Sequence, residues 1–207
     1  MMVKAKGPVW HKKDKDKGII PKGPHGLDKM ATWAKSVAKG WIYGHGTFML
    51  TSFEIPIVGI FQYMVNSANE AKRMHVEMVK YASLAKKVFM DSKADDQKIY
   101  YDLKKSYRMQ LVTKTRKGMD KSETRKQMIK EMSTKQNHKD YLKRSTTVEP
   151  MQGLMDDIFE LERCWMRGDI NNRWLFGAMG IAVQMAQLKA YKEKRSTWEI
   201  KNDVLGI

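Results

Sequence analysis

Few residues in this chain are of types that do chemistry, and their spacing forms no recognised catalytic or metal-binding pattern. Cys164 is the single cysteine, and the five histidines are scattered along the chain: His11, His25, His45, His75 and His138. One cysteine excludes an intramolecular disulfide framework and, with histidines at these intervals, a Cys-rich zinc module. Cys164 lies in a stretch with amphipathic helical spacing and is expected to be a small buried hydrophobe. The sequence therefore predicts no metal and no cofactor.

Neighbouring carboxylates and a glycine pair are the other chemically suggestive features. Asp95–Asp96 and Asp156–Asp157 are adjacent pairs, and adjacent residues point to different parts of a helix surface. We therefore expect both pairs to lie on solvated faces rather than around a substrate. Gly44-His-Gly46 lies in an apolar stretch and lacks the strand–glycine–helix context and the lysine of a phosphate-binding loop. These patterns predict that the protein is not an enzyme.

The charge of the chain is strongly basic and is divided into two blocks. Its 207 residues carry 39 Lys and Arg against 23 Asp and Glu, a formal net charge of +16. Residues 1–39 and 70–172 each carry +7, whereas residues 40–69 carry the single charge of Glu54. A large basic excess is typical of proteins that bind nucleic acid, anionic membrane surfaces or acidic proteins. The division argues against one continuous nucleic-acid-binding tract.

The chain organises into four regions, all of which are predicted to be helical or extended. These are an extended Pro/Gly/Lys arm at 1–26, an amphipathic helix and apolar stretch at 27–66, a basic helical region at 67–148, and an amphipathic helix, short apolar helix and tail at 149–207. Within the basic region, capping patterns predict helix starts at 67–70, after 92–95 and at 120–123. No segment shows sustained period-two alternation, so no strand is required. The predicted fold class is all-α, with one membrane-embedded helix, or two, and long amphipathic basic helices.

The apolar stretch at 40–65 is the predicted transmembrane segment. A helix from Trp41 to Tyr63 would be about 33 Å long, close to the ~30 Å hydrocarbon thickness. Aromatic residues near both ends are typical of membrane interfaces. Three residues argue against a span: His45, Glu54 and Pro56. The alternative is that 40–50 and a helix beginning near Ser52 are both buried in a soluble core.

Within such a span, His45 and Glu54 are the candidate intramembrane polar contacts, for a proton relay, a lipid headgroup or a basic residue of a partner. Glycines at close helical spacing predict helix packing at four positions: Gly40, Gly44, Gly177 and Gly180. The second apolar segment, 174–188, would reach only about 22 Å as a helix. It is either stretched into a span by its basic flanks or a buried or re-entrant helix.

The layout resembles that of the supernumerary subunits of mitochondrial inner-membrane complexes, such as respiratory-chain complexes and ATP synthase. This resemblance lies in overall layout and not in a family motif. It implies a non-catalytic structural accessory subunit in the mitochondrial inner membrane, or another organellar membrane. Its partners would be other protein subunits and lipid headgroups, including anionic ones. The alternatives are an organellar ribosomal or other RNA-binding protein, with Tyr100, Tyr101 and Tyr107 among its basic residues, and a soluble helical bundle that binds another protein.

Overall fold

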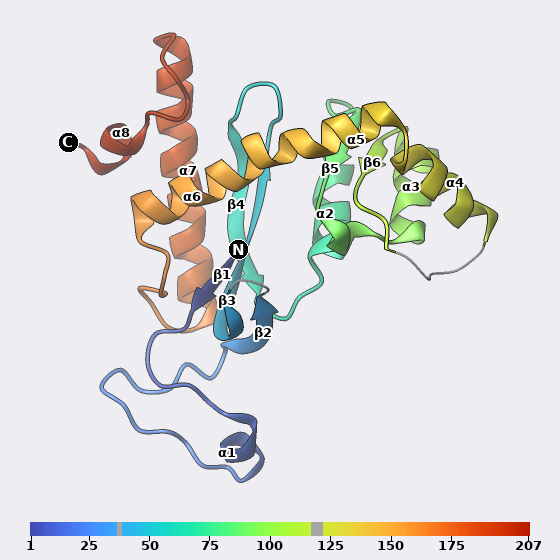
Figure 1. Cartoon of the computed structure of the whole chain (residues 1–207). Coiled ribbons are helices and arrows are strands. Elements are labelled where there is room, and N and C mark those ends of the chain that lie inside the picture. The colour runs from blue at the N-terminus through green and yellow to red at the C-terminus, as the bar shows by residue number, and fades with distance from the viewer. Residues whose placement is uncertain (37–38, 117–121) are drawn as a thin grey trace. The chain divides into compact units, whose positions relative to one another are not determined.

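The structure is a computed structural model that describes residues 1–36, 39–116 and 122–207. It is a mixed α/β protein with 46% helix, 18% strand and two sheets (Figure 1), so the predicted all-α fold class is wrong. The chain divides into two compact units. Unit 1 consists of Met1–Ala68 and Pro150–Ile207, and unit 2 consists of Asn69–Glu149.

The sheet of unit 1 is built around one long central strand. Its strands are β1 (Met2–Lys4), β2 (Thr32–Ser36), β3 (Gly40–Thr51) and β4 (Val58–Val65). The three others all pair with β3 in antiparallel register, β2 along its first half and β4 along its second half. His45 at the middle of β3 is therefore paired with Val3 on one side and with Val65 on the other.

The predicted transmembrane helix at 40–65 is wrong, because these residues form the β3–β4 hairpin. Glu54 is exposed in the connection between the two strands, where water solvates its charge, and Pro56 lies in the same connection, where it interrupts no ladder hydrogen bond. The stretches on either side of this connection are rich in β-branched and aromatic residues, which favour strands. Strand β3 is buried on both faces from Ile42 to Phe48, so it lacks the polar–apolar alternation by which a half-exposed strand is recognised.

Two further parts of the predicted layout are also corrected. The expected amphipathic helix after Leu27 is instead a turn followed by β2, and the expected extended arm contains β1 and the short helix α1 (Lys12–Asp16). Among the residues that the structure describes, no helix is long and apolar enough to cross a membrane. The apolar segment 174–188 is the middle of the longest helix, α7 (Asp169–Lys192), which packs on β4.

The core of unit 1 lies between the β3–β4 hairpin and its C-terminal helices. Besides α7 these are α6 (Val148–Phe159), which begins two residues before unit 1, and the short α8 (Lys201–Leu205). Helix α7 runs alongside β4 (Figure 1). The rings of Phe61 on β4 and Phe176 on α7 pack edge-to-face with their centroids 6.0 Å apart. Apolar residues of α6 complete this cluster: Met151, Met155, Ile158 and Phe159.

In its described residues, 69–116 and 122–149, unit 2 contains a small parallel sheet and four helices. The elements are α2 (Glu70–Val79), β5 (Lys87–Phe89), α3 (Gln97–Tyr107), β6 (Gln110–Val112), α4 (Glu123–Met132) and α5 (Lys135–Leu142), with 3-10 turns at Ser92–Ala94 and Lys143–Thr146. Strands β5 and β6 pair in parallel, and α3 lies in the connection between them. Three helices begin close to the starts predicted from sequence, with N-cap side chains at Asn69, Asp96 and Ser122.

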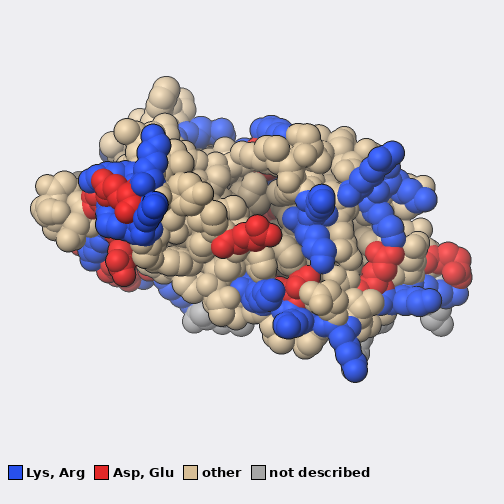
Figure 2. Space-filling view, turned by 90° about the horizontal axis from the view of Figure 1, so that it is seen from above, with Lys and Arg blue, Asp and Glu red and all other residues tan. Residues whose placement is uncertain are grey.

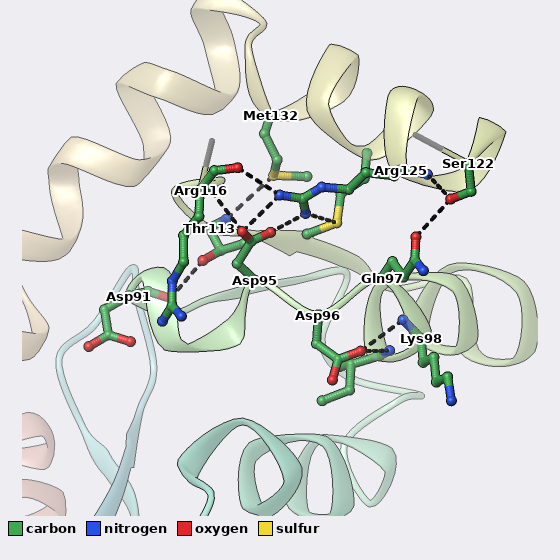
Figure 3. A network of polar contacts seen from close by, with 12 residues as sticks. Asp91, Asp95, Asp96, Gln97, Lys98, Thr113, Arg116, Ser122, Arg125 and Met132 are labelled. Atoms are coloured by element: carbon green, nitrogen blue, oxygen red, sulfur yellow. Dashed lines mark hydrogen bonds and ion pairs between the residues drawn. The ribbon is translucent and has the colours of Figure 1, made fainter. Parts of the chain in front are cut away.

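A buried ion pair joins α4 to the segment before α3 in unit 2 (Figure 3). The Arg125 guanidinium contacts both oxygens of Asp95, and these side chains are 3% and 0% exposed. The Arg116 amide also donates to Asp95 Oδ2 at 2.6 Å, and Arg125 Nη2 donates to the Arg116 carbonyl at 3.0 Å. The prediction of a solvated face is therefore wrong for Asp95, whereas its neighbour Asp96 caps α3.

Burial and pairing act in opposite directions on the Asp95 carboxyl. Desolvation by burial, the larger single effect, raises its pKa, but the hydrogen bonds from Arg125 and from the Arg116 amide together outweigh it. The net result is a pKa below the ordinary value. Asp95 is therefore a buried anion whose charge depends on Arg125.

Candidate interaction surface

Unit 1 contains a fully buried polar pair where three parts of the chain meet. His45 Nε2 lies 2.9 Å from Asp28 Oδ2, and the two side chains are 0% and 1% exposed. The same carboxylate accepts the Gly168 amide at 2.9 Å and the Met30 amide at 3.1 Å. His45 Nδ1 lies 3.3 Å from the Tyr63 hydroxyl. Asp28 thus links the segment before β2, the centre of β3 and the N-cap of α7.

This geometry indicates a structural role for His45. Its ring is enclosed on both nitrogens by groups of the same unit, so it has no surface on which to receive a substrate proton. The prediction of an intramembrane contact for His45 and Glu54 fails together with the span that it required. His45 is instead paired inside the protein, and Glu54 lies exposed in the hairpin connection.

Because Asp28 is buried and hydrogen-bonded, we predict that unit 1 loses stability in acid. Burial alone raises the pKa of this carboxyl, but the hydrogen bonds from His45 and Gly168 together hold it below the ordinary value of 3.8. A carboxyl with a depressed folded-state pKa stabilises the protein above pH 4, and that stabilisation is lost as the pH falls through the folded pKa. Asp28→Asn should therefore show a smaller loss of stability between pH 5 and pH 2 than the parent protein.

Urea unfolding followed by tryptophan fluorescence measures this effect, because all six tryptophans lie in unit 1. The matched control is Asp16→Asn, which removes an exposed carboxylate from α1. An acid dependence of Asp28→Asn that equals that of the parent protein would contradict the prediction.

The four glycines expected to pack helices have different roles. Gly40 (φ +70°) and Gly44 lie in β3 and not in a helix. A Cβ on Gly44 would lie 2.0 Å from the Val3 carbonyl oxygen, so this position needs glycine for β1 to pair closely. On α7, a Cβ on Gly180 would lie 2.9 Å from the Phe61 carbonyl oxygen, whereas one on Gly177 would meet no atom within 4 Å. Gly180 therefore allows α7 to approach a strand.

The face of α7 that does not contact the sheet carries a continuous row of apolar side chains. We call this row the α7 stripe; its members are three or four residues apart and all are exposed: Ile170, Trp174, Ala178, Ile181, Met185 and Leu188. Trp174 is 78% exposed and Met185 67% exposed. The opposite face holds buried Phe176, Val183 and Ala190. One helix thus presents an apolar surface in two directions.

Two surface hollows adjoin the beginning of α7, and both are lined by Met166 and Arg167. One also includes Lys6, His25 and Trp165; the other includes Asp28, Lys29, Met30 and Asn171. Asp28 is the single carboxylate among these lining residues, and its side chain is buried and hydrogen-bonded to His45. The hollows are therefore basic, with the partly exposed Trp165 and Met166 beside them.

Nothing in the described residues has the geometry of a catalytic or metal centre that we can recognise. No group of three His, Cys, Asp or Glu side chains within them is placed to hold a metal ion. Cys164 is buried, as the sequence predicts, and burial raises the pKa of its thiol to about 12. A thiol with that pKa is protonated at neutral pH and is a poor nucleophile.

Sequence reasoning missed Asp28 and the exposed face of α7. Asp28 stands in a turn-rich segment with no motif around it, so nothing marked it as the partner of His45. A signal for the α7 stripe was present, because 174–188 is apolar on every side of a helix. Such a helix is normally buried on all sides. In this protein α7 packs against a single sheet face, which covers one side of the helix and leaves the other side exposed.

Charge is distributed over the surface without a single dominant patch on the face drawn in Figure 2. Lys and Arg side chains there alternate with Asp and Glu and with uncharged areas. Comparisons of the chain with protein-family models, with curated proteins and with solved structures found no match. The functional argument therefore depends on the geometry of the molecule itself.

Proposed function

We propose that the chain is a non-catalytic accessory subunit that binds another protein of a larger assembly through the α7 stripe. The observation that supports this function is the row of exposed large apolar side chains from Ile170 to Leu188. Contiguous apolar surface of this kind marks interaction sites in soluble proteins. The row covers 18 helical rises, about 27 Å. A partner helix of about five turns, lying along α7, matches this length.

The basic hollows specify the chemistry of one end of the partner. Lys6, Lys29 and Arg167 lie beside the beginning of the stripe, and the one lining carboxylate is already paired. A partner helix with an apolar face and acidic residues at the end that meets these hollows would complement both features. Trp174 and its neighbour Ile170 are the expected anchors, because large aromatic side chains dominate binding energy at interfaces.

An anionic membrane surface is the competing partner for an apolar row with basic neighbours. Two cations within the helix that carries the stripe, Arg173 and Lys189, favour a protein instead. Arg173 lies 3.7 Å from Asp169, and Lys189 bonds Asp203 at 2.6 Å, so these two cations already have acidic neighbours. They would contribute little attraction to lipid headgroups. Placement in an organellar inner-membrane complex stays a prediction, and the proposed binding mode does not require a span.

Disruption of the stripe should abolish partner binding without unfolding the chain. In Trp174→Asp/Ile181→Asp, two exposed side chains become charged, and the loss of an interface anchor typically costs at least about 2 kcal/mol, or roughly 30-fold in affinity. Affinity purification of the full chain from its native cells measures recovery of the partner, and circular dichroism checks the fold. The matched control is Leu84→Asp, which charges an 82% exposed leucine of unit 2.

Site-specific photocrosslinking identifies the occupant. With benzoylphenylalanine in place of Ile181, we expect a crosslink to an apolar helical segment of another protein, and none from the same group at Leu84. Crosslinks between copies of this chain, or flotation with anionic lipid vesicles that Trp174→Asp/Ile181→Asp abolishes, would contradict the proposal and identify self-association or membrane binding instead.

A further inference from the structure

Unit 2 carries a positive charge that its own carboxylates do not balance. It has 21 Lys and Arg against 11 Asp and Glu, a net charge of +10 in 81 residues. Ten of these carboxylates are in described residues, and all ten have internal partners. Eight contact a Lys, Arg or His side chain: Glu70, Glu77, Asp95, Asp102, Glu123, Glu131, Asp140 and Glu149. The other two, Asp91 and Asp96, accept backbone amides at helix starts.

Part of the excess forms a row along α3 that ends at its C-cap, Arg108, which has a left-handed backbone conformation (φ 53°). Lys98, Tyr101, Lys105 and Arg108 follow one another at intervals of three, four and three residues, and all four are exposed. Tyr101 is 52% exposed. Within the described part of the chain, no carboxylate pairs with Lys98, Lys105 or Arg108. Figure 3 shows the Lys98 side chain directed away from the buried Asp95–Arg125 network. From Lys98 to Lys105 the row covers seven helical rises, about 10 Å, and Arg108 follows at the end of the helix.

The parallel strands bring one further cation to the end of this row. The Lys86 carbonyl accepts the Gln110 amide at 2.9 Å, which places exposed Lys86 beside the chain that leaves Arg108. Other basic residues of this region are already engaged in pairs. Lys104 contacts Glu131, and Arg125 is buried against Asp95. The structure thus separates basic residues that hold the unit together from those left at its surface.

We propose that the α3 row, Lys98, Tyr101, Lys105 and Arg108, binds single-stranded nucleic acid. Cations spaced along a helix neutralise successive phosphates, and an exposed aromatic ring among them offers a face on which a base stacks. An acidic protein is the competing occupant of this row, and competition with polyglutamate distinguishes it from a nucleic acid. This binding site belongs to unit 2 and does not depend on the α7 stripe.

Fluorescence anisotropy with the full chain and a labelled 15-nucleotide oligouridine tests the proposal between 50 and 200 mM KCl. Lys98→Ala/Lys105→Ala/Arg108→Ala should weaken binding at least tenfold, and should reduce the slope of log affinity against log salt by about 2, since each phosphate contact on a single strand contributes about 0.7. Tyr101→Ala should weaken binding about 5- to 150-fold, whereas Tyr101→Phe, which keeps the ring, should leave it unchanged.

The matched control removes equal charge from another part of unit 2. Lys130→Ala/Lys135→Ala/Lys139→Ala changes three exposed lysines of α4 and α5, and should change the affinity less than about threefold. Equal losses from the two triple variants would overturn the proposal in favour of diffuse charge attraction. It would also be overturned if Tyr101→Ala bound like the parent, or if polyglutamate competed as well as unlabelled oligouridine. Trp174→Asp/Ile181→Asp should retain RNA binding, so failure of the α7 interface remains distinguishable.

Discussion

Arg125→Met is expected to lower the free energy of unfolding of unit 2 by about 3–5 kcal/mol. The substitution keeps much of the side-chain volume but leaves the Asp95 carboxylate buried without its charge partner, and an uncompensated buried charge costs this much. Hydrogen–deuterium exchange of α3 and α4 peptides measures the loss in unit 2 directly. Tryptophan fluorescence, which reports on unit 1 alone, should change little.

Two comparisons separate this effect from a general loss of charge. Lys126→Met changes the next residue, whose exposed pair with Glu123 is expected to contribute less than about 1 kcal/mol. In Asp95→Leu/Arg125→Met both charges are replaced, and much of the lost stability should return, because no unpaired charge stays buried. If Arg125→Met and Lys126→Met were equally stable, the buried pair would not hold unit 2 together.

Gly44→Ala should destabilise unit 1 by about 3 kcal/mol or more, at the upper end of the cost of overpacking. The added methyl group would lie 2.0 Å from the Val3 carbonyl oxygen and 3.0 Å from the Ala5 nitrogen, and both are backbone atoms that cannot rotate away. Strand β1 must therefore move off β3. Urea unfolding followed by tryptophan fluorescence measures the loss.

Gly177→Ala is the control for Gly44→Ala, since it adds the same methyl group to another glycine of unit 1. No atom lies within 4 Å of that position, and alanine favours a helix over glycine by about 0.5–1 kcal/mol. This variant should therefore be slightly more stable than the parent protein. Similar destabilisation by the two variants would show that close approach of β1 does not set the requirement at Gly44.

Sequence patterns predicted the local features of this chain better than its fold. Helix starts near Glu70, Gln97 and Glu123 were found because capping side chains act on backbone amides only two or three residues away. The β3–β4 hairpin was missed because its strands are apolar on both faces and equal a membrane span in length. Periodicity alone does not distinguish a doubly buried strand from a buried helix.

The functional surfaces, like the fold, were only partly predictable from the sequence. His45 was singled out for its apolar surroundings, but its partner Asp28 lies 17 positions earlier and is brought to it by the pairing of β2 with β3. The sequence shows that 174–188 is apolar. It does not show that one face of this helix is exposed, because that depends on which elements α7 packs against. Likewise, the division of the charge argued against one continuous nucleic-acid-binding tract, whereas the basic residues left exposed in unit 2 could be identified only once the internal partners of its carboxylates were known.

Unit 1 is built from two segments of the chain that are separated in sequence by unit 2, and this order affects its folding during synthesis on the ribosome. The β3–β4 hairpin is complete at Val65, yet α7, which covers its apolar face, begins about 100 residues later at Asp169. At 5–20 residues per second, the hairpin waits roughly 5–20 s for this helix, while unit 2, a continuous segment, can fold in the interval. Strand β1 waits longer, for about 160 residues, until Cys164 is made, whose amide donates to the Lys4 carbonyl at 2.7 Å. The nascent chain therefore exposes an apolar hairpin throughout that interval, and the hairpin is the segment where we expect chaperones to bind.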